Sequence, residues 1–305
     1  MQEEPLILIC DHRGSGLSSR LTRLASTGHH LRHSSHLRET LQILREEAPS
    51  LIVLDPFAPS GRAELDELDR LRGEAPLLFV SDPDRPLPAP ILQADLSDAA
   101  WDVIRRDATI DEYELRIARL QESAARNDEL EELRYVASHD DRTDLLRPEA
   151  FQERLREHFS ATQRHGLDLV FAILDLDDFG QINKVFDHTV GDLVIERVGE
   201  AIRRALRAED VAGRLGGDEF AVLLPYTKKL DGARVVNRIR TEVAGLTDEF
   251  AARGIHTRIS CSIGFETFSG ADIESVEELR RHTEVALQRA KHAGGNCGVY
   301  FRSQA

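Results

Sequence analysis

Short runs of purely apolar residues, spaced along the first hundred positions, constrain this chain most strongly. They are Leu6 to Cys10, Leu51 to Leu54 and Leu77 to Val80, and stretches with helical spacing of leucines separate the first two. A strand that is apolar at every position must be covered on both faces, which is typical of a parallel sheet with helices on either side. We therefore predict a doubly wound α/β domain over residues 1–109.

A polar residue follows each of these runs. Asp11 and Asp55 come directly after the first two, and Ser81 follows the third. In open parallel sheets the functional crevice lies at the carboxyl ends of the strands. We expect these three side chains to meet there.

This arrangement resembles the receiver domain of two-component response regulators. The resemblance implies that Asp55 is a phosphoacceptor and that a sensor histidine kinase is a partner. Receivers usually hold Mg²⁺ with two adjacent acids, where this chain has Asp11 and His12, and they carry a lysine where Arg106 stands after the expected strand Trp101 to Ile104. One fewer carboxylate weakens a site for a hard cation, and arginine does not replace lysine as a point charge. Two interpretations stay open: a phosphorylated receiver, and a receiver-shaped module used only for dimerisation.

Residues 110–138 have the pattern of a long charged helix. Apolar positions recur at alternating steps of three and four, as in a coiled-coil seam. The seam positions are Ile110, Tyr113, Ile117, Leu120, Ala124 and the polar Asn127, followed by Leu130, Leu133 and Ala137. We predict a dimerising helical stalk. The alternative is a single amphipathic helix packed on a domain.

The rest of the chain, residues 139–305, predicts an α+β domain with one mixed sheet and a palm-like plan. The apolar run Leu169 to Leu174 ends at Asp175, and Thr257 to Phe265 alternates like a strand. Two strand-like runs meet at Gly216-Gly217, which predicts a β-hairpin. The absence of Cβ atoms at this pair would let another molecule lie against the backbone.

Carboxylates follow two of these strands. Asp175 ends one, and Asp218 and Glu219 stand at the hairpin tip. If the two strands are neighbours, the acids converge on a site of oxygen ligands suited to Mg²⁺ or Mn²⁺ on a nucleoside triphosphate. Either acidic position by itself is more typical of a solvated turn, so the pair carries the prediction.

Composition excludes several classes of function. A net charge of −15 disfavours broad binding to nucleic acid or to a membrane surface. No apolar run approaches the ~20 residues that a membrane-spanning helix needs. The three cysteines form no metal-ligand pair or disulfide framework. Hydrophobic content of 41% is enough for real cores, and charged content of 30% indicates a soluble protein. Because the scattered cysteines are typical of inert thiols in a reducing compartment, we expect the protein to be cytoplasmic.

The stretch from Arg214 to Phe220, Arg-Leu-Gly-Gly-Asp-Glu-Phe, resembles the signature of GGDEF-domain diguanylate cyclases. Other motifs occur in the family's order between Ser138 and Phe301. They are the opening motif around His139, Asp140, Asp144 and Leu145; Asp175 to Phe179; Ile182-Asn183; Gly191-Asp192; Ser262-Ile263-Gly264; and Ala290-Lys291 with Gly294.

The resemblance implies that two GTP are condensed to cyclic di-GMP, with release of two pyrophosphates, across a homodimer. Asp175, Asp218 and Glu219 would be catalytic, and Asp175, Asp218 and the Leu176 carbonyl would hold the metal. The substrate-binding residues would be Asn183 and Asp192 on guanine, Phe179, Gly216 and Gly217 along the nucleotide, and Lys291 on the terminal phosphates.

The resemblance also implies an inhibitory site for the product, formed by Arg207 and Asp210 of an Arg-x-x-Asp motif together with Arg238. Some family positions differ here: Arg142 and Asp144 replace a leucine and a glycine of the opening motif, and Gly180 and Gly295 stand where cations are usual. An alternative function is therefore a catalytically weak domain that binds cyclic di-GMP as an effector. A cyclase of relaxed base specificity is a third, which Asp192 disfavours.

Overall fold

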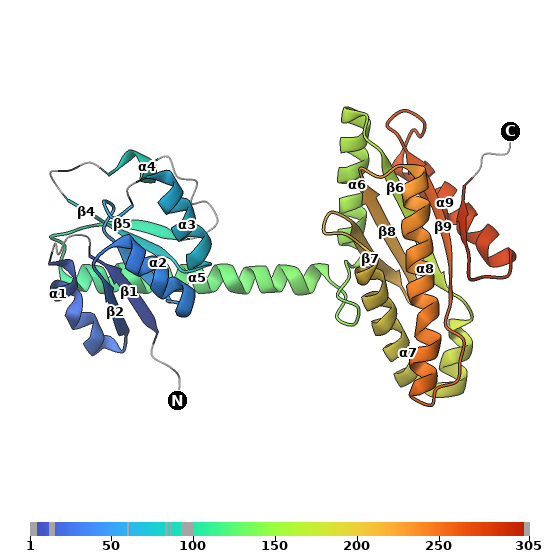
Figure 1. The fold of residues 1–305 in the computed structure, drawn as a ribbon, viewed down its shortest axis with the longest axis horizontal. Helices are drawn as coiled ribbons and strands as arrows, with labels where there is room; N and C mark the ends of the chain where they lie inside the picture. The colour runs from blue at the N-terminus through green and yellow to red at the C-terminus, as the bar shows by residue number, and fades with distance from the viewer. Residues whose placement is uncertain are drawn as a thin grey trace. The chain divides into compact units, whose positions relative to one another are not determined.

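The computed structural model describes residues 5–11, 16–59, 61–82, 85, 87–92 and 100–301, so His12 lies outside the described residues. The chain divides into two compact units, residues 1–132 and 133–305, and each is described by itself (Figure 1).

The first unit is built on a five-stranded sheet in which every neighbouring pair is parallel. Its strands are β1 (Leu6–Cys10), β2 (His30–Ser34), β3 (Leu51–Leu54), β4 (Leu77–Ser81) and β5 (Trp101–Arg105), in the order β2-β1-β3-β4-β5. The predicted parallel sheet is confirmed. Strand β2 was not predicted, because it lies at the edge of the sheet and its polar, largely exposed sequence has no apolar run.

Helices cover both faces of this sheet. Its helical segments are α1 (Leu17–Leu21), the 3₁₀ helix η1 (Thr22–Thr27), α2 (Leu37–Glu46), α3 (Arg62–Arg72), α4 (Ala89–Leu92) and α5 (Ile110–Ser138). Alternate residues of the central strands divide between two buried clusters, one against α2 and α3 and one against α1 and α5. This is the doubly wound arrangement that the apolar strands predict.

The packing of α5 shows that part of the predicted coiled-coil seam is wrong. Tyr113, Ile117 and Leu120 are buried in the core of the first unit, so they are not available to a partner helix. Beyond them the exposed apolar residues include Leu130 and Leu133. The proximal half of the helix thus matches the packed-helix alternative, and only the distal half could form a seam.

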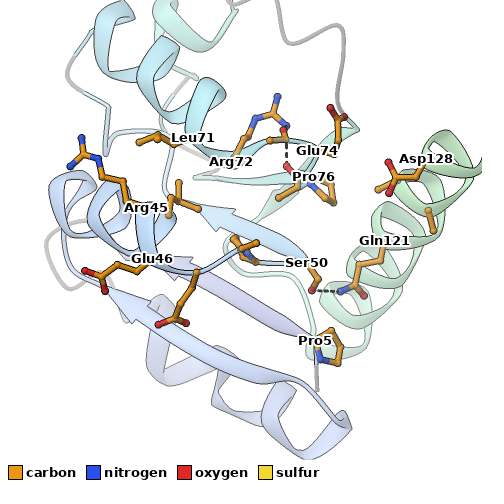
Figure 2. A pocket seen from close by; sticks show the side chains of 18 residues that line it. Pro5, Arg45, Glu46, Ser50, Leu71, Arg72, Glu74, Pro76, Gln121 and Asp128 are labelled. Atoms are coloured by element: carbon orange, nitrogen blue, oxygen red, sulfur yellow. Dashed lines mark hydrogen bonds between the residues drawn. The ribbon is translucent and has the colours of Figure 1, made fainter. Parts of the chain in front are cut away.

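A hollow of about 820 Å³ opens beside the amino ends of the strands of the first unit (Figure 2). Pro5, Ser50 and Pro76, which precede β1, β3 and β4, line one part of it. Gln121 of α5 lines another part and donates a hydrogen bond from Nε2 to Ser50 Oγ at 3.0 Å. The hollow is therefore at the opposite end of the strands from Asp11 and Asp55, away from the crevice where such folds bind ligands.

The second unit has one mixed sheet, as predicted, and the sheet has five strands. Its strands are β6 (Leu169–Leu176), β7 (Val211–Gly216), β8 (Glu219–Pro225), β9 (Cys261–Phe268) and β10 (Gly298–Tyr300), in the order β10-β9-β6-β8-β7. Only the β9–β10 pair is parallel. The strand predicted from Thr257 begins later, at Cys261, because residues 257–260 join no ladder.

Strand β6 is buried at every residue because helices lie on both sides of it. The four helices are α6 (Pro148–His165), α7 (Phe179–Arg204), α8 (Lys229–Ala252) and α9 (Val276–His292). Val170, Ala172 and Leu174 pack with residues of α7 and α8, whereas Leu169, Phe171 and Ile173 pack with residues of α6 and α9. Figure 1 shows the strands between these helices.

Among the residues that the structure describes, no helix combines the length and the apolar character needed to cross a membrane.

Close packing of α9 against β9 requires a glycine at position 264, the last residue of the Ser-Ile-Gly motif. A Cβ atom there would lie 2.2 Å from the backbone nitrogen of Leu287 and 2.3 Å from the carbonyl oxygen of Thr283, both in α9. Helix and strand therefore touch backbone to backbone at this point.

We predict that Gly264→Ala lowers the free energy of unfolding by about 1–3 kcal/mol, because α9 must move away from the sheet. Urea unfolding followed by circular dichroism measures the change. Gly245→Ala is the matched control, since Gly245 is exposed in α8 with open space around it, and it should raise stability by about 0.5–1 kcal/mol. Equal effects at the two positions would contradict the proposed contact.

Candidate active site

The hairpin between β7 and β8 leaves open space above its glycines. Gly216 has φ 151° and Gly217 has φ 52°, conformations that residues with a Cβ rarely adopt. A Cβ atom built at either position would have no neighbour within 4 Å. The tip can therefore accept a ligand directly against its backbone.

Arg214 holds this tip in place. Its guanidinium donates to the carbonyl oxygen of Gly217 at 2.8 Å and to both carboxylate oxygens of Asp140 at 3.2 Å. Burial tends to raise the pKa of Asp140, but hydrogen bonds from Thr143 and Arg214 outweigh it and lower that pKa below its usual value. Residues 139–147, which we call the opening loop, are thus tied to the hairpin by an ion pair that sequence reasoning missed.

The register of the sheet brings the predicted acids to one edge. Strands β6 and β8 are antiparallel neighbours, with Asp175 directly opposite Glu219. The backbone nitrogen of Leu176 donates to the carbonyl oxygen of Asp218 at 3.3 Å. A hollow of about 210 Å³ next to them is lined by Glu219 and by α9 residues that include Lys291.

Lys291 forms an ion pair with Asp175, the most buried of these acids. Its Nζ is 2.7 Å from Oδ2 of Asp175. Burial raises the pKa of Asp175, the ion pair with Lys291 opposes the rise, and the charge of Asp218 adds to it. The carboxylate therefore sits where a positive charge stabilises it.

The residues predicted to read guanine come together because α7 is sharply bent. A straight helix would separate Asn183 and Gly191 by about 12 Å. Instead, a Cβ atom built at Gly191 would lie 1.9 Å from Oδ1 of Asn183 and 3.4 Å from the ring of Phe179. Asp192 follows Gly191, and its carboxylate forms an ion pair with Arg142 of the opening loop.

Comparison with known proteins agrees with this geometry. The family model described as "Diguanylate cyclase, GGDEF domain" matches residues 137–297, more than half of the chain. The chain belongs to the GGDEF family.

Among curated relatives of this GGDEF protein, the diguanylate cyclase DgcP of Pseudomonas aeruginosa is 37% identical over 174 residues, covering 57% of this chain and 25% of DgcP. The chain spans about a quarter of the length of the first such relatives.

Several solved structures are similar to the chain, including the following two. The coiled coil and GGDEF domain of DgcB from Caulobacter crescentus, in complex with c-di-GMP, is 26% identical with a TM-score of 0.54 and covers 62% of this chain and 99% of that one. The diguanylate cyclase SiaD of Pseudomonas aeruginosa, in complex with its activator SiaC, is 30% identical with a TM-score of 0.51, covering 62% of this chain and 75% of that one.

The donor set of this GGDEF protein fits a hard divalent cation. Asp175 and Asp218 would supply carboxylate oxygens and Leu176 a carbonyl, and the positive charge of Lys291 already lies on Asp175. In the described part of the chain, no group of three or more His, Cys, Asp or Glu side chains is arranged to hold a metal. Mg²⁺ is commonly held by one or two carboxylates together with substrate phosphates, so this set suits a metal that arrives with a nucleotide.

Asp177 has a structural task that its motif alone did not reveal. Its carboxylate accepts hydrogen bonds from Ser260 Oγ at 2.7 Å, Ser262 Oγ at 2.6 Å and the backbone nitrogen of Asn296 at 2.8 Å. It therefore fixes β9 and the segment after α9 beside the acids. The same carboxylate accounts for the glycine at position 295. The backbone there has φ 75°, and a Cβ atom built at that position would lie 2.9 Å from the Asp177 carboxylate.

The residues of the predicted product site lie together, at the start of β7 rather than at its tip. Asp210 Oδ2 accepts a hydrogen bond from the backbone nitrogen of Arg207 at 3.0 Å, and Arg238 donates from Nε to the carbonyl oxygen of Ala205 at 2.9 Å. Burial raises the pKa of Asp210, and the charges of Arg207 and Arg238 oppose the rise. Two guanidinium groups and one carboxylate therefore share this surface.

Proposed function

We propose that this protein is a diguanylate cyclase that condenses two GTP into cyclic di-GMP and releases two pyrophosphates. One observation carries the proposal: Asp175 and Glu219 face each other across neighbouring strands, under an open Gly-Gly hairpin. Membership of the GGDEF family and similarity to named diguanylate cyclases support it.

Each side chain has a task in this proposal. The carboxylate of Asp192 accepts from N1–H and N2–H₂ of guanine, donors that adenine does not present on that edge, and Asn183 adds a hydrogen bond. Phe179, Gly216 and Gly217 line the nucleotide, and Lys291 moves from Asp175 to the terminal phosphates. Asp175, Asp218 and the Leu176 carbonyl would hold Mg²⁺ or Mn²⁺, which would supply positive charge against the phosphates. Asp218 and Glu219 face the 3′-hydroxyl. Its oxygen bonds to the α-phosphorus, the bond from that phosphorus to pyrophosphate breaks, and a carboxylate at this tip accepts the hydroxyl proton.

The reaction requires two copies of the chain, because each site positions one GTP and the 3′-oxygen of one must reach the α-phosphorus of the other. We propose a homodimer joined through the distal half of α5. Leu130 and Leu133 support this, because they are 50% and 57% exposed. A water-exposed apolar stripe on a long helix favours pairing with a second helix.

We predict that purified wild-type protein converts GTP to cyclic di-GMP in the presence of Mg²⁺, and that Asp218→Ala lowers turnover at least about 100-fold, as loss of a preorganised catalytic group commonly does. Chromatography of the products measures this. Asp231→Ala, on the exposed side of α8, is the control and should retain activity.

Undiminished turnover in Asp218→Ala would refute the metal and catalytic assignment. A wild-type protein that binds cyclic di-GMP but makes none from GTP would instead favour the effector function.

We also propose that cyclic di-GMP inhibits the enzyme by binding Arg207, Asp210 and Arg238. Arginine can pair with phosphate or stack on guanine, and a carboxylate can accept from the guanine edge. The clustering of these three side chains at the start of β7, away from the hairpin tip, supports a regulatory rather than a catalytic role.

We expect Arg207→Ala to keep its initial rate while losing inhibition, because the variant removes a contact to product and none to substrate. Progress curves with cyclic di-GMP added at the start measure this. Arg234→Ala, an exposed arginine of α8, serves as control. Inhibition that persists unchanged in Arg207→Ala would exclude this site.

For the first unit we propose a receiver-like module that works without phosphorylation. The strand order β2-β1-β3-β4-β5 is that of flavodoxin-like folds, which include receivers. Asp55 lies at the carboxyl end of β3 and is only 4% exposed. Its Oδ2 is 3.1 Å from a guanidinium nitrogen of Arg106, which also donates to Asp82 at 2.6 Å. An arginine that bridges two acids already supplies the crevice with a positive charge, which supports the phosphorylation-independent interpretation.

We predict that beryllofluoride with Mg²⁺, which mimics an aspartyl phosphate, changes neither the dimer mass nor the rate of cyclic di-GMP formation. Light scattering and product assays measure these, with Asp55→Asn treated in parallel. A response that wild type shows and Asp55→Asn lacks would establish Asp55 as a phosphoacceptor and would restore the sensor kinase as a partner.

A further inference from the structure

Arg142 contacts the one carboxylate that we assign to guanine recognition. Its guanidinium forms an ion pair with Oδ1 of Asp192, and each of the two side chains is 45% exposed. The pair joins the opening loop to α7 across a separation of 50 residues in the sequence. Nucleotide and arginine would therefore need the same acceptor.

The two donors are chemically alike. The N1–H and N2–H₂ edge of guanine is itself a guanidine group, with parallel N–H donors that match a carboxylate. The guanidinium of arginine presents the same fork and adds a positive charge. Arg142 thus imitates the base at the position where the base would be read.

The backbone on both sides of Arg142 is fixed. Asp140 is held by Arg214 and by Thr143, whose backbone nitrogen and Oγ1 donate to its Oδ1 at 3.0 and 2.8 Å. Asp144, at φ 57°, accepts hydrogen bonds from Tyr135 and Arg203. The loop therefore keeps the Arg142 side chain within reach of Asp192, and only the half-exposed side chain is free to move.

We infer that Arg142 is a gate on the base-reading site: it pairs with Asp192 in the nucleotide-free protein and must swing away before guanine is bound. The inference rests on the proposed function, because that function makes Asp192 the guanine reader. It adds a specificity-determining residue that competes with the base instead of contacting it. The gate raises the GTP concentration needed without blocking the site, since an exposed ion pair changes a binding constant by at most about fivefold.

The direction in which nucleotide affinity changes when Arg142 is replaced distinguishes a gate from a cation that simply attracts phosphate. Loss of a cation close to a triphosphate weakens nucleotide binding if the cation attracts the phosphates. Loss of a cation that occupies Asp192 strengthens binding of guanine nucleotides and leaves adenine nucleotides unaffected.

The test measures binding by calorimetry, with analogues of GTP and ATP that carry a methylene bridge between the α- and β-phosphates and cannot react. For Arg142→Leu we expect the Kd of the GTP analogue to fall by about two- to fivefold, with no gain for the ATP analogue. Arg142→Gln, which keeps a polar side chain, should shift the Kd in the same direction. Arg154→Leu is the matched control, because Arg154 forms a comparably exposed pair with Glu157 on α6.

Weaker or unchanged binding of the GTP analogue to both Arg142 variants would overturn the gate. So would an equal gain for both analogues, because only guanine competes for Asp192. If wild type binds the GTP analogue but forms no cyclic di-GMP, the proposed function fails while the gate can still hold. If wild type is active and the variants bind like wild type, the gate fails and the function stands. A protein that binds neither analogue would refute both.

Discussion

The whole second unit depends on the complete burial of β6 between two helical layers. Each of its eight residues is buried, including Asp175, and its two neighbours are both antiparallel strands. Because alternate side chains pack against different helix pairs, a slip of one residue would exchange the two cores. That constraint sets the register of β8, and the register sets Asp175 opposite Glu219. The position of Asp175 relative to Glu219 is therefore set by apolar packing several residues away.

Around this edge, side chains that we propose to bind the nucleotide are already in ion pairs within the protein. Lys291 neutralises Asp175, Arg142 neutralises Asp192, and Arg214 joins Asp140 to the hairpin. In the Arg142–Asp192 pair both side chains are 45% exposed, so the pair is weak, and in the Lys291–Asp175 pair the lysine is 45% exposed although Asp175 is buried. Both members of the Asp140–Arg214 pair are only 15–16% exposed, and this pair serves as scaffold. In the proposed function, the phosphates and the metal would offer new partners to Lys291 and Asp175, and the guanine edge would offer one to Asp192. Binding would then replace internal ion pairs rather than create charges in an empty site.

The first unit also has acids at the edge of its sheet that are paired with a basic side chain of the same unit. Its crevice brings Asp55 and Asp82 to the carboxyl ends of parallel strands, and Arg106 bridges them. Removal of the arginine would leave the buried Asp55 without its charged partner, with the hydrogen bond from the Phe57 backbone nitrogen still in place, and loss of one member of a buried ion pair is costly. The ion pair with Arg106 therefore gives Asp55 a role in the folded unit that does not depend on phosphate.

The sequence by itself determined the two sheets, the hairpin, the order of the family motifs and the candidate acids, since apolar periodicity and glycine pairs are local signals that survive without tertiary contacts. It missed β2, because an exposed edge strand has no apolar run. It assigned Tyr113, Ile117 and Leu120 to a partner helix, because an amphipathic stripe does not specify what covers it. Only the tertiary structure decided that Asn183 meets Gly191 through a bend in α7, that Asp177 anchors β9, and that Arg142 lies on Asp192. These contacts join residues 8 to 119 positions apart, and charged side chains of this kind have many possible partners until the packed core has fixed where each backbone segment lies.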